Sequence, residues 1–286
     1  MSLHDKRRLA ALIRSALSED LGQPGDITSR ALFDAHETAR AAIISKSAGI
    51  LSGAQVIRPL FGRLNRSLSV KVLLKNGAPL AAGSRICELS GSVRAILAGE
   101  RVALNFLQHL SGVATAANTL ARLLSHTKAR LLDTRKTTPL LRALEKEAVI
   151  HGGGLNHRFG LFDMVLIKDT HVKAAGGVGP AIRKARAFVK KSGHTTKIEV
   201  EIQTVGEFTE ALSCRPHRIM LDNMSIADMA ACVALAKKSG VHAELEASGN
   251  VTADTIVNIA ETGVDFISVG SITHSAPALD IHLVIE

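Results

Sequence analysis

Hydrophobic and polar positions follow a helical period at the start of the chain and a shorter period after it. In the first 21 residues the apolar side chains recur at helical spacing, which predicts an amphipathic helix. These side chains are Leu9, Leu12, Ile13, Leu17 and Leu21. Short apolar runs follow and predict strands at 40–45, 50–53, 69–74 and 85–89. Asn76-Gly77 predicts a turn between the last two, and a broad apolar face from Val93 onward predicts a long helix.

From about Lys128 a new pattern begins and then recurs along the chain. An apolar run ends in a polar residue, and a glycine or a helical stretch follows. The predicted strands are 129–132, 164–167, 197–200, 218–221, 242–247 and 265–269. The helices predicted between them are 180–191, 205–212, 226–238 and 252–262. Repeated strand–helix units of this kind predict a parallel sheet with functional residues at the carboxyl ends of its strands.

The length of this second region decides between a complete and an incomplete barrel. A full eightfold barrel takes roughly 250 residues, and the region from 128 to 275 is much shorter. We therefore predict an α/β protein, an incomplete (open) TIM-like barrel preceded by an N-terminal α+β sandwich domain. The expected boundaries are 1–113 for the N-terminal domain and 114–275 for the barrel. The strand-like segment within 276–286 has no helix after it and is a candidate to return to the first domain.

Composition and charge narrow the class of function. Hydrophobic residues are 46% and charged residues 21% of the chain, which is typical of a globular protein with a full core. Trp and Tyr are absent, so base-stacking side chains are scarce and single-stranded nucleic acid is a poor partner. The formal net charge is +9. Residues 1–113 hold 15 Lys and Arg against 8 Asp and Glu, so most of the excess is N-terminal, where a basic field attracts anionic partners.

Several features predict a cytoplasmic protein without a membrane partner. Cys87, Cys214 and Cys232 show no metal-ligand spacing, and we expect buried thiols in a reducing compartment. No apolar run approaches the length of a membrane span. The first 16 residues are rich in charge and lack the uncharged core of a secretory signal.

Four cations lie at or just beyond apolar runs in glycine-rich sequence. They are Arg135, Lys136, Arg158 and Lys168. A buried cation is costly unless an anion compensates it, and planar guanidinium groups favour carboxylate or phosphate. These residues therefore predict a pocket for a highly anionic small molecule.

Two carboxylates end neighbouring predicted strands. Glu201 and Asp222 could face one cavity and hold Mg²⁺, either directly or through water, because this ion prefers oxygen ligands. The alternative is that they pair with Lys136 or Lys168. The two interpretations are compatible, since a carboxylate can neutralise the empty site and bind metal with the substrate.

The loops after the last two predicted strands are candidate phosphate sites. Their residues are Ser248, Gly249, Asn250, Val269, Gly270 and Ser271. In barrels such loops grip phosphate through backbone N–H groups, although one Ser-Gly pair alone is only a turn. His274 follows the last strand and could contact the same phosphate. His157 adjoins Arg158 after three glycines at 152–154, so we expect a ligand contact and a close backbone approach there.

Several longer motifs resemble those of the quinolinate phosphoribosyltransferase family. They are Asp-Thr-Arg-Lys-Thr-Thr-Pro at 133–139, Gly-Gly-Gly-Leu-Asn-His-Arg-Phe-Gly-Leu at 152–161, Leu-Ile-Lys-Asp-Thr-His at 166–171, Leu-Asp-Asn-Met at 221–224, Glu-Ala-Ser-Gly-Asn at 246–250 and Ile-Ser-Val-Gly-Ser-Ile-Thr-His-Ser at 267–275. Asp20-Leu21-Gly22 with Gly25-Asp26 matches the N-terminal motif. The departures, Leu140 and Thr170, flank the charged positions and leave them intact.

The resemblance implies an activity that the charges explain. The family transfers the phosphoribosyl group of phosphoribosyl pyrophosphate to quinolinate, with loss of carbon dioxide and pyrophosphate, giving nicotinate mononucleotide for NAD biosynthesis. It implies Lys136, Glu201 and Asp222 as catalytic residues, with Mg²⁺ as cofactor at the two carboxylates. The implied substrate contacts are Arg101, Thr134, Arg135, His157, Arg158, Lys168, Ser248, Gly249, Asn250, Val269, Gly270, Ser271 and His274. It also implies a homodimer or higher homo-oligomer, in which Arg101 reaches the neighbouring subunit's site.

Three other functions remain as alternatives. A molybdenum-transport-associated relative shares the arginine–lysine segment, but its pattern lacks the Ile-Lys-Asp-Thr-His form. A non-catalytic binder of phosphorylated metabolites would use the same basic pocket without turnover. A Schiff-base lyase would use Lys168 as its nucleophile, although such sites rarely need Arg135 and Arg158 beside the lysine.

Overall fold

The structure, a computed structural model, describes residues 3–193 and 195–286. The chain divides into two compact units that interleave along the sequence. The first comprises Met1–Asn118, Thr138–Gly152 and Ala276–Glu286, and the second comprises Thr119–Thr137 and Gly153–Ser275. The loop after the first strand of the second unit therefore contributes a helix to the first unit before the chain returns.

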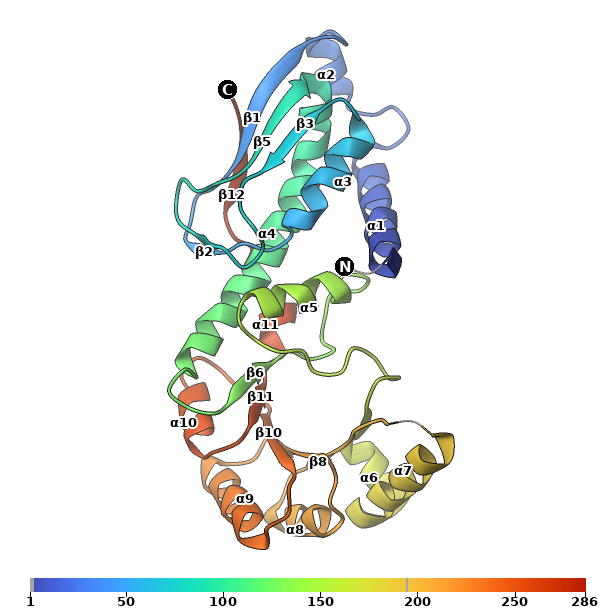
Figure 1. The fold of residues 1–286 in the computed structure, drawn as a ribbon, viewed down its shortest axis with the longest axis vertical. Helices are drawn as coiled ribbons and strands as arrows, with labels where there is room; N and C mark the ends of the chain where they lie inside the picture. The colour runs from blue at the N-terminus through green and yellow to red at the C-terminus, as the bar shows by residue number, and fades with distance from the viewer. Residues whose placement is uncertain (1–2, 194) are drawn as a thin grey trace. The chain divides into compact units, whose positions relative to one another are not determined.

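The first unit combines a four-stranded antiparallel sheet with helices (Figure 1). The sheet order is β12-β1-β5-β3, with strands β1 (Thr38–Ser45), β3 (Ser69–Val72), β5 (Arg85–Ser92) and β12 (Ile281–Ile285). The helices are α1 (Leu3–Leu21), α2 (Ile27–Leu32), α3 (Ala54–Leu64), α5 (Arg142–His151) and the first part of α4 (Val93–Leu123). β12 pairs with β1, so the end of the chain completes the sheet begun near residue 38.

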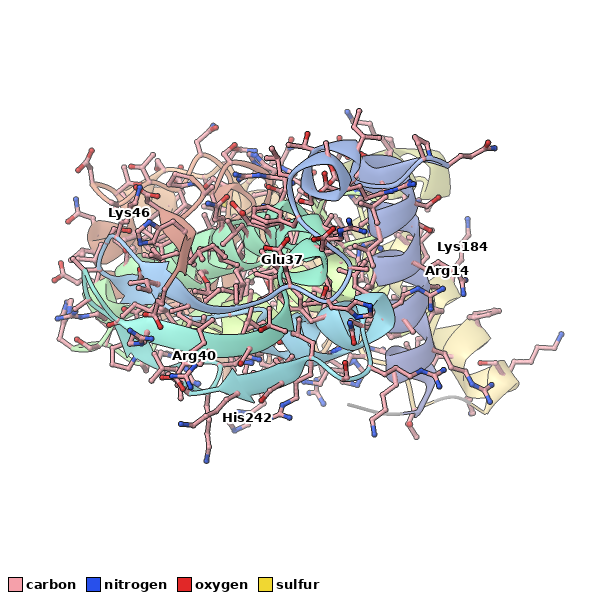
Figure 2. All side chains as sticks on the ribbon, turned by 90° about the horizontal axis from the view of Figure 1, so that it is seen from above. Arg14, Glu37, Arg40, Lys46, Lys184 and His242 are labelled. Atoms are coloured by element: carbon pink, nitrogen blue, oxygen red, sulfur yellow. The ribbon has the colours of Figure 1, made fainter. Side chains whose placement is uncertain are left out.

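An aliphatic core holds the first unit together, as the shortage of aromatic residues requires. Ile43 of β1, Leu60 of α3 and Leu107 of α4 are fully buried. Removing such side chains from water contributes about 1.5–3 kcal/mol each. The basic excess lies outside this core: Figure 2 labels Arg14 on α1 and Arg40 on β1, and both side chains are exposed.

The turn predicted at Asn76-Gly77 forms, but the connection around it is longer than the pattern shows. A turn does form there, with Gly77 at φ 83°, and β3 pairs with β5 as the pattern predicts. However, strand β4 (Pro79–Leu80) intervenes and pairs with β2 (Gly49–Ile50), so the connection is long. Backbone hydrogen bonds of Leu51 with Gly77 and Ala78 draw the turn toward β2. Of the strand expected at 50–53, only Ile50 lies in a strand, and α3 begins at Ala54.

The second unit contains a six-stranded parallel sheet in the order β6-β11-β10-β9-β8-β7. The strands are β6 (Arg130–Leu132), β7 (Val165–Ile167), β8 (Ile198–Ile202), β9 (Arg218–Asp222), β10 (Glu244–Ser248) and β11 (Phe266–Ser268). β6 pairs with β11, whereas β7 pairs only with β8, so the sheet stays open between its first two strands. The prediction of an incomplete barrel is confirmed.

Helices connect these strands and cover the sheet (Figure 1). They are α6 (Asp169–Ala175), α7 (Val178–Ser192), α8 (Val205–Ser213), α9 (Ile226–Ser239), α10 (Ile256–Glu261) and α11 (Ser271–His274). The periodicity places α7, α8 and α9 within two residues of their observed ends, but α10 begins later than expected. Periodicity missed α2, α3, α5, α6 and α11, most of which are too short for a clear apolar stripe. Within the described ranges, no helix has the length and hydropathy that a membrane span requires.

Candidate active site

The carboxyl ends of the parallel strands meet at one cavity of about 690 Å³ in the second unit. β8 brings Glu201, β9 brings Asp222 and β10 brings Ser248, while Lys168 and Val269 directly follow β7 and β11. Because successive parallel strands end on the same edge of a sheet, residues far apart in sequence converge there. The pocket is large enough for a substrate of metabolite size.

All the site residues predicted in this unit line the cavity, although their roles stay predictions. They are Thr134, Arg135, Lys136, His157, Arg158, Lys168, Glu201, Asp222, Ser248, Gly249, Asn250, Val269, Gly270, Ser271 and His274. Leu166, Met220, Asn223, Glu246, Val251 and Ser268 complete the lining and were not predicted. Of these, Asn223 and Glu246 are polar groups with specific contacts.

The four predicted cations surround the pocket but are not buried, which corrects the expectation of costly buried charge. Lys136 and Lys168 are exposed, and Arg135 and Arg158 are half-buried. Burial, followed by repulsion from Arg135, lowers the pKa of Arg158. A row of like charges facing one hollow therefore still favours an anionic ligand, although these cations are open to solvent.

The chain around Lys136 is fixed by hydrogen bonds on both sides. Its backbone N–H donates to Thr134 Oγ1 at 3.0 Å, and Thr273 Oγ1 donates to its carbonyl oxygen at 2.8 Å. A Cβ at Gly270 would meet Lys136 Cδ at 2.9 Å, so the glycine leaves room for the lysine stem. These contacts hold the segment while leaving the ammonium group exposed.

Glu201 and Asp222 form the acidic part of the pocket. Burial raises the pKa of Glu201; Lys168 opposes this shift and the Asp222 carboxylate adds to it. Lys168 Nζ lies 4.0 Å from Glu201 Oε1, so the predicted pairing is loose. Two carboxylates that repel one another on adjacent strands provide the oxygen donors that Mg²⁺ prefers. The donor set thus fits the ion that the resemblance implies.

The loop after β10 depends on a glycine and on an asparagine that sequence reasoning missed. Gly249 has φ +102°, and a Cβ there would lie 2.1 Å from Asn223 Oδ1. Asn223 itself has φ 54°, accepts from Asn250 Nδ2 at 3.2 Å and donates to Asp222 Oδ2 at 3.0 Å. Asn223 thereby ties the acidic strand end to the predicted phosphate loop. An asparagine directly after a strand is the available sequence signal, because it tolerates a left-handed conformation.

The triple glycine does not bring backbone to a ligand, so that expectation is wrong. None of residues 152–154 lines the cavity. A Cβ on Gly152 would lie 2.2 Å from the carbonyl oxygen of Ala114, so this glycine lets the end of α5 pack closely against α4.

His157 lies at the floor of the pocket, where both ring nitrogens face protein groups. Its Nε2 is 3.0 Å from Glu199 Oε2 and 3.5 Å from Glu246 Oε2, and its Nδ1 accepts the Arg158 backbone N–H at 2.7 Å. Burial alone would lower the pKa of His157, but the contacts with Glu199 and Glu246 outweigh it and raise the pKa to about 9. Sequence reasoning assigned no role to either glutamate, because both lie inside apolar strand patterns.

Arg101 lies in the first unit, on α4. Its side chain is exposed and forms a 3.9 Å ion pair with Glu100. That Arg101 contacts the substrate in a neighbouring subunit's site stays a prediction.

Comparisons with known proteins identify the family on both units. A family model described as quinolinate phosphoribosyl transferase, C-terminal domain, matches residues 113–284, and the model of the N-terminal domain matches residues 26–111. The chain is 41% identical over 276 residues to a protein of Bacillus subtilis named probable nicotinate-nucleotide pyrophosphorylase [carboxylating], covering 96% of this chain and 93% of that protein.

A plant relative and a solved structure agree. The chloroplastic nicotinate-nucleotide pyrophosphorylase [carboxylating] of Arabidopsis thaliana is 39% identical, over 99% of this chain and 84% of that one. The structure of nicotinate-nucleotide pyrophosphorylase from Francisella tularensis superposes with a TM-score of 0.92 at 39% identity, covering 98% and 96% of the two chains. The chain therefore belongs to the quinolinate phosphoribosyltransferase family.

Proposed function

We propose that this protein transfers the phosphoribosyl group of phosphoribosyl pyrophosphate to quinolinate, releasing pyrophosphate and carbon dioxide and forming nicotinate mononucleotide. The observation that carries the proposal is the single cavity in which four cations face two carboxylates. The substrates together present two carboxylates, a phosphate and a diphosphate, which the cations can neutralise. The names of the relatives, carboxylating nicotinate-nucleotide pyrophosphorylases, support the same reaction.

The positions of the side chains support a division of labour within the pocket. We assign Arg135, Arg158 and Lys168 to the carboxylates of quinolinate and Lys136 to the diphosphate, whose departure leaves positive charge on the ribose. Glu201 and Asp222 favour that charge electrostatically. The pyridine nitrogen then attacks the anomeric carbon. Its new positive charge stabilises the electron pair left when the adjacent carboxylate departs as carbon dioxide, and a proton taken up from solvent at that ring carbon gives nicotinate mononucleotide.

The remaining predicted contacts complete the substrate site. We assign the 5-phosphate to the loops at 248–250 and 269–271 together with His274, because both loops and the histidine line the cavity. Glu201 and Asp222 would hold Mg²⁺, which when bound supplies positive charge at the leaving diphosphate. A cytoplasmic location stays a prediction.

The decisive experiment is incubation of the purified protein with quinolinate, phosphoribosyl pyrophosphate and Mg²⁺. We expect nicotinate mononucleotide, pyrophosphate and carbon dioxide in equal amounts. Leaving out each component in turn tests its role, and nicotinate in place of quinolinate tests the need for the second carboxylate. Tight binding of both substrates without any product would favour the non-catalytic binder and overturn the proposal.

Replacing Arg135 should weaken quinolinate binding selectively. A charge-assisted hydrogen bond contributes roughly 1.5–3 kcal/mol, so we expect Arg135→Ala to raise the quinolinate KM about tenfold to a hundredfold. Folding should be intact because the side chain lines a pocket. Steady-state kinetics in quinolinate test this, with Arg183→Ala, an exposed arginine of α7, as the control. An unchanged quinolinate profile would count against the assignment.

A site shared between subunits predicts rescue between two inactive variants. We propose a homodimer or larger homo-oligomer in which Arg101 of one subunit completes the pocket of another. Arg101→Ala and Lys136→Ala should each be inactive alone, and a mixture allowed to exchange subunits should regain activity. Failure of rescue despite exchange confirmed by mass spectrometry would argue against sharing.

A further inference from the structure

A buried cluster of charged side chains lies at the floor of the pocket. The reaction proposed above assigns no role to three of its members, Glu199, Glu246 and Arg218. Glu199 of β8 and Glu246 of β10 are both 0% exposed, and both carboxylates approach Nε2 of the His157 ring. Arg218 of β9 donates from Nη1 to Glu246 Oε2 at 2.9 Å, and its guanidinium lies over the Phe266 ring at 4.2 Å. Buried charges are costly to retain unless they are paired.

Ion-pair contacts and one hydrogen bond connect this cluster to Arg158 through the His157 ring. The backbone N–H of His157 donates to Asp133 Oδ1 at 2.8 Å, and that of Arg158 donates to His157 Nδ1 at 2.7 Å. Nε2 faces the two glutamates and carries a proton toward them. The orientation of the ring therefore sets the position of the Arg158 backbone at the pocket wall.

The two glutamates differ in what compensates them. Glu246 accepts a hydrogen bond from the Arg218 guanidinium. Glu199 instead forms an ion-pair contact with the His157 ring at 3.0 Å. Glu199 also lies closer to the ring, with its Oε2 3.0 Å from Nε2 against 3.5 Å for Glu246 Oε2. Glu199 is therefore the residue whose removal acts on His157 most directly.

The same atoms could also be considered as metal ligands. His157, Glu199 and Glu246 offer ligand atoms within 4.8 Å of one another. Two contacts disfavour that use. A metal would need the Nε2 lone pair, but Nε2 carries a proton toward the two carboxylates, whose contacts raise the pKa of His157. The Arg218 guanidinium also already occupies one side of Glu246.

We propose that Glu199 and Glu246 are positioning residues for substrate binding: they hold the His157 ring, which holds Arg158 at the quinolinate end of the pocket. The inference rests on the proposed function, because it assigns Arg158 to quinolinate. Neither glutamate is required to touch substrate. The expected consequence of losing Glu199 is a defect in quinolinate binding that leaves phosphoribosyl pyrophosphate binding largely intact.

The test measures the dissociation constants of both substrates separately by isothermal titration calorimetry. Glu199→Met removes the carboxylate at nearly constant volume, and we expect quinolinate to bind about tenfold more weakly or worse. The dissociation constant of phosphoribosyl pyrophosphate should change less than about twofold on the same reasoning. Glu199→Gln keeps an oxygen acceptor for Nε2–H, so its quinolinate affinity should lie between those of Glu199→Met and the wild type. If Glu199→Met does not fold, the glutamine variant carries the comparison.

Glu244→Met is the matched control. Glu244 pairs with the same Arg218, at 3.0 Å, but it is not among the ion-pair partners of His157 in the described part of the chain and lies outside the cavity lining. The Glu244→Met substitution should leave the affinities for quinolinate and phosphoribosyl pyrophosphate unchanged. Equal weakening of both substrates by Glu199→Met, or no weakening, overturns the positioning role. A stoichiometric transition metal in the wild-type protein that Glu199→Met loses also overturns it. Wild-type protein that binds no quinolinate would instead overturn the proposed function itself.

Discussion

Lys136→Ala should lower kcat about a hundredfold to a thousandfold, the range found when a group that stabilises transition-state charge is removed. The diphosphate becomes more negative as its bond to ribose breaks, so a cation beside it acts mainly in the transition state. Lys136 is placed for this because its backbone is held by Thr134 and Thr273 while its side chain reaches the pocket. The KM values should change much less than kcat, because the other cations still bind the ground-state substrates.

Pre-steady-state release of pyrophosphate is the direct measurement, since it isolates the step in which the leaving group departs. Lys184→Ala is the matched control: Lys184 of α7 is exposed, is labelled in Figure 2 and lies outside the cavity lining. Lys136→Arg keeps the charge and should recover part of the rate. A Lys136→Ala variant that releases pyrophosphate at the wild-type rate would remove this lysine from the chemistry.

Arg218→Met should lower the free energy of unfolding by about 3–5 kcal/mol, the usual cost of removing one partner of a buried ion pair. Arg218 is 8% exposed and donates to both Glu244 and Glu246. Without it, the fully buried Glu246 and Glu199 lose their guanidinium partner and lie close to one another beside His157. The loss of packing over the Phe266 ring adds to the same effect.

Equilibrium urea unfolding followed by circular dichroism measures this loss. Glu244→Gln should cost less than about 1 kcal/mol, because Glu244 is partly exposed and water can replace its partner. Adding Glu246→Gln to Arg218→Met removes the uncompensated charge and should restore part of the stability. A loss below about 1 kcal/mol for Arg218→Met would show that the cluster is not a structural ion-pair network.

Local pattern predicted most of the second unit correctly because its strands and helices are regular and repeat. The polar residues that end or directly follow these apolar runs, Lys168, Glu201 and Asp222, lie at strand ends in the structure. Parallel pairing then requires their side chains to share one edge of the sheet. The glycine loops at 249 and 270 followed from the same rule. The motifs, rather than composition, gave the family, which the matches over both units establish.

Where the pattern failed, contacts between distant segments decided the outcome. Gly152 serves helix packing against Ala114, more than 30 residues away, so its role cannot be read from its neighbour His157. Asn76-Gly77 forms a turn, but Leu51 determines which strand follows it. Glu199 and Glu246 alternate with apolar residues on short strands, and only the assembled sheet shows that they lie together beneath one histidine.

The sequence by itself determined the open α/β sheet, the residues at its strand ends and the family, because side-chain periodicity and contiguous motifs are local properties of the chain. The tertiary structure decided which charges are buried and which are exposed. Burial depends on packing between segments far apart in sequence, and it changes the free energy of a charge by several kcal/mol. For that reason the cations predicted to be buried line an open pocket, while the carboxylates of Glu199 and Glu246 are buried beside His157.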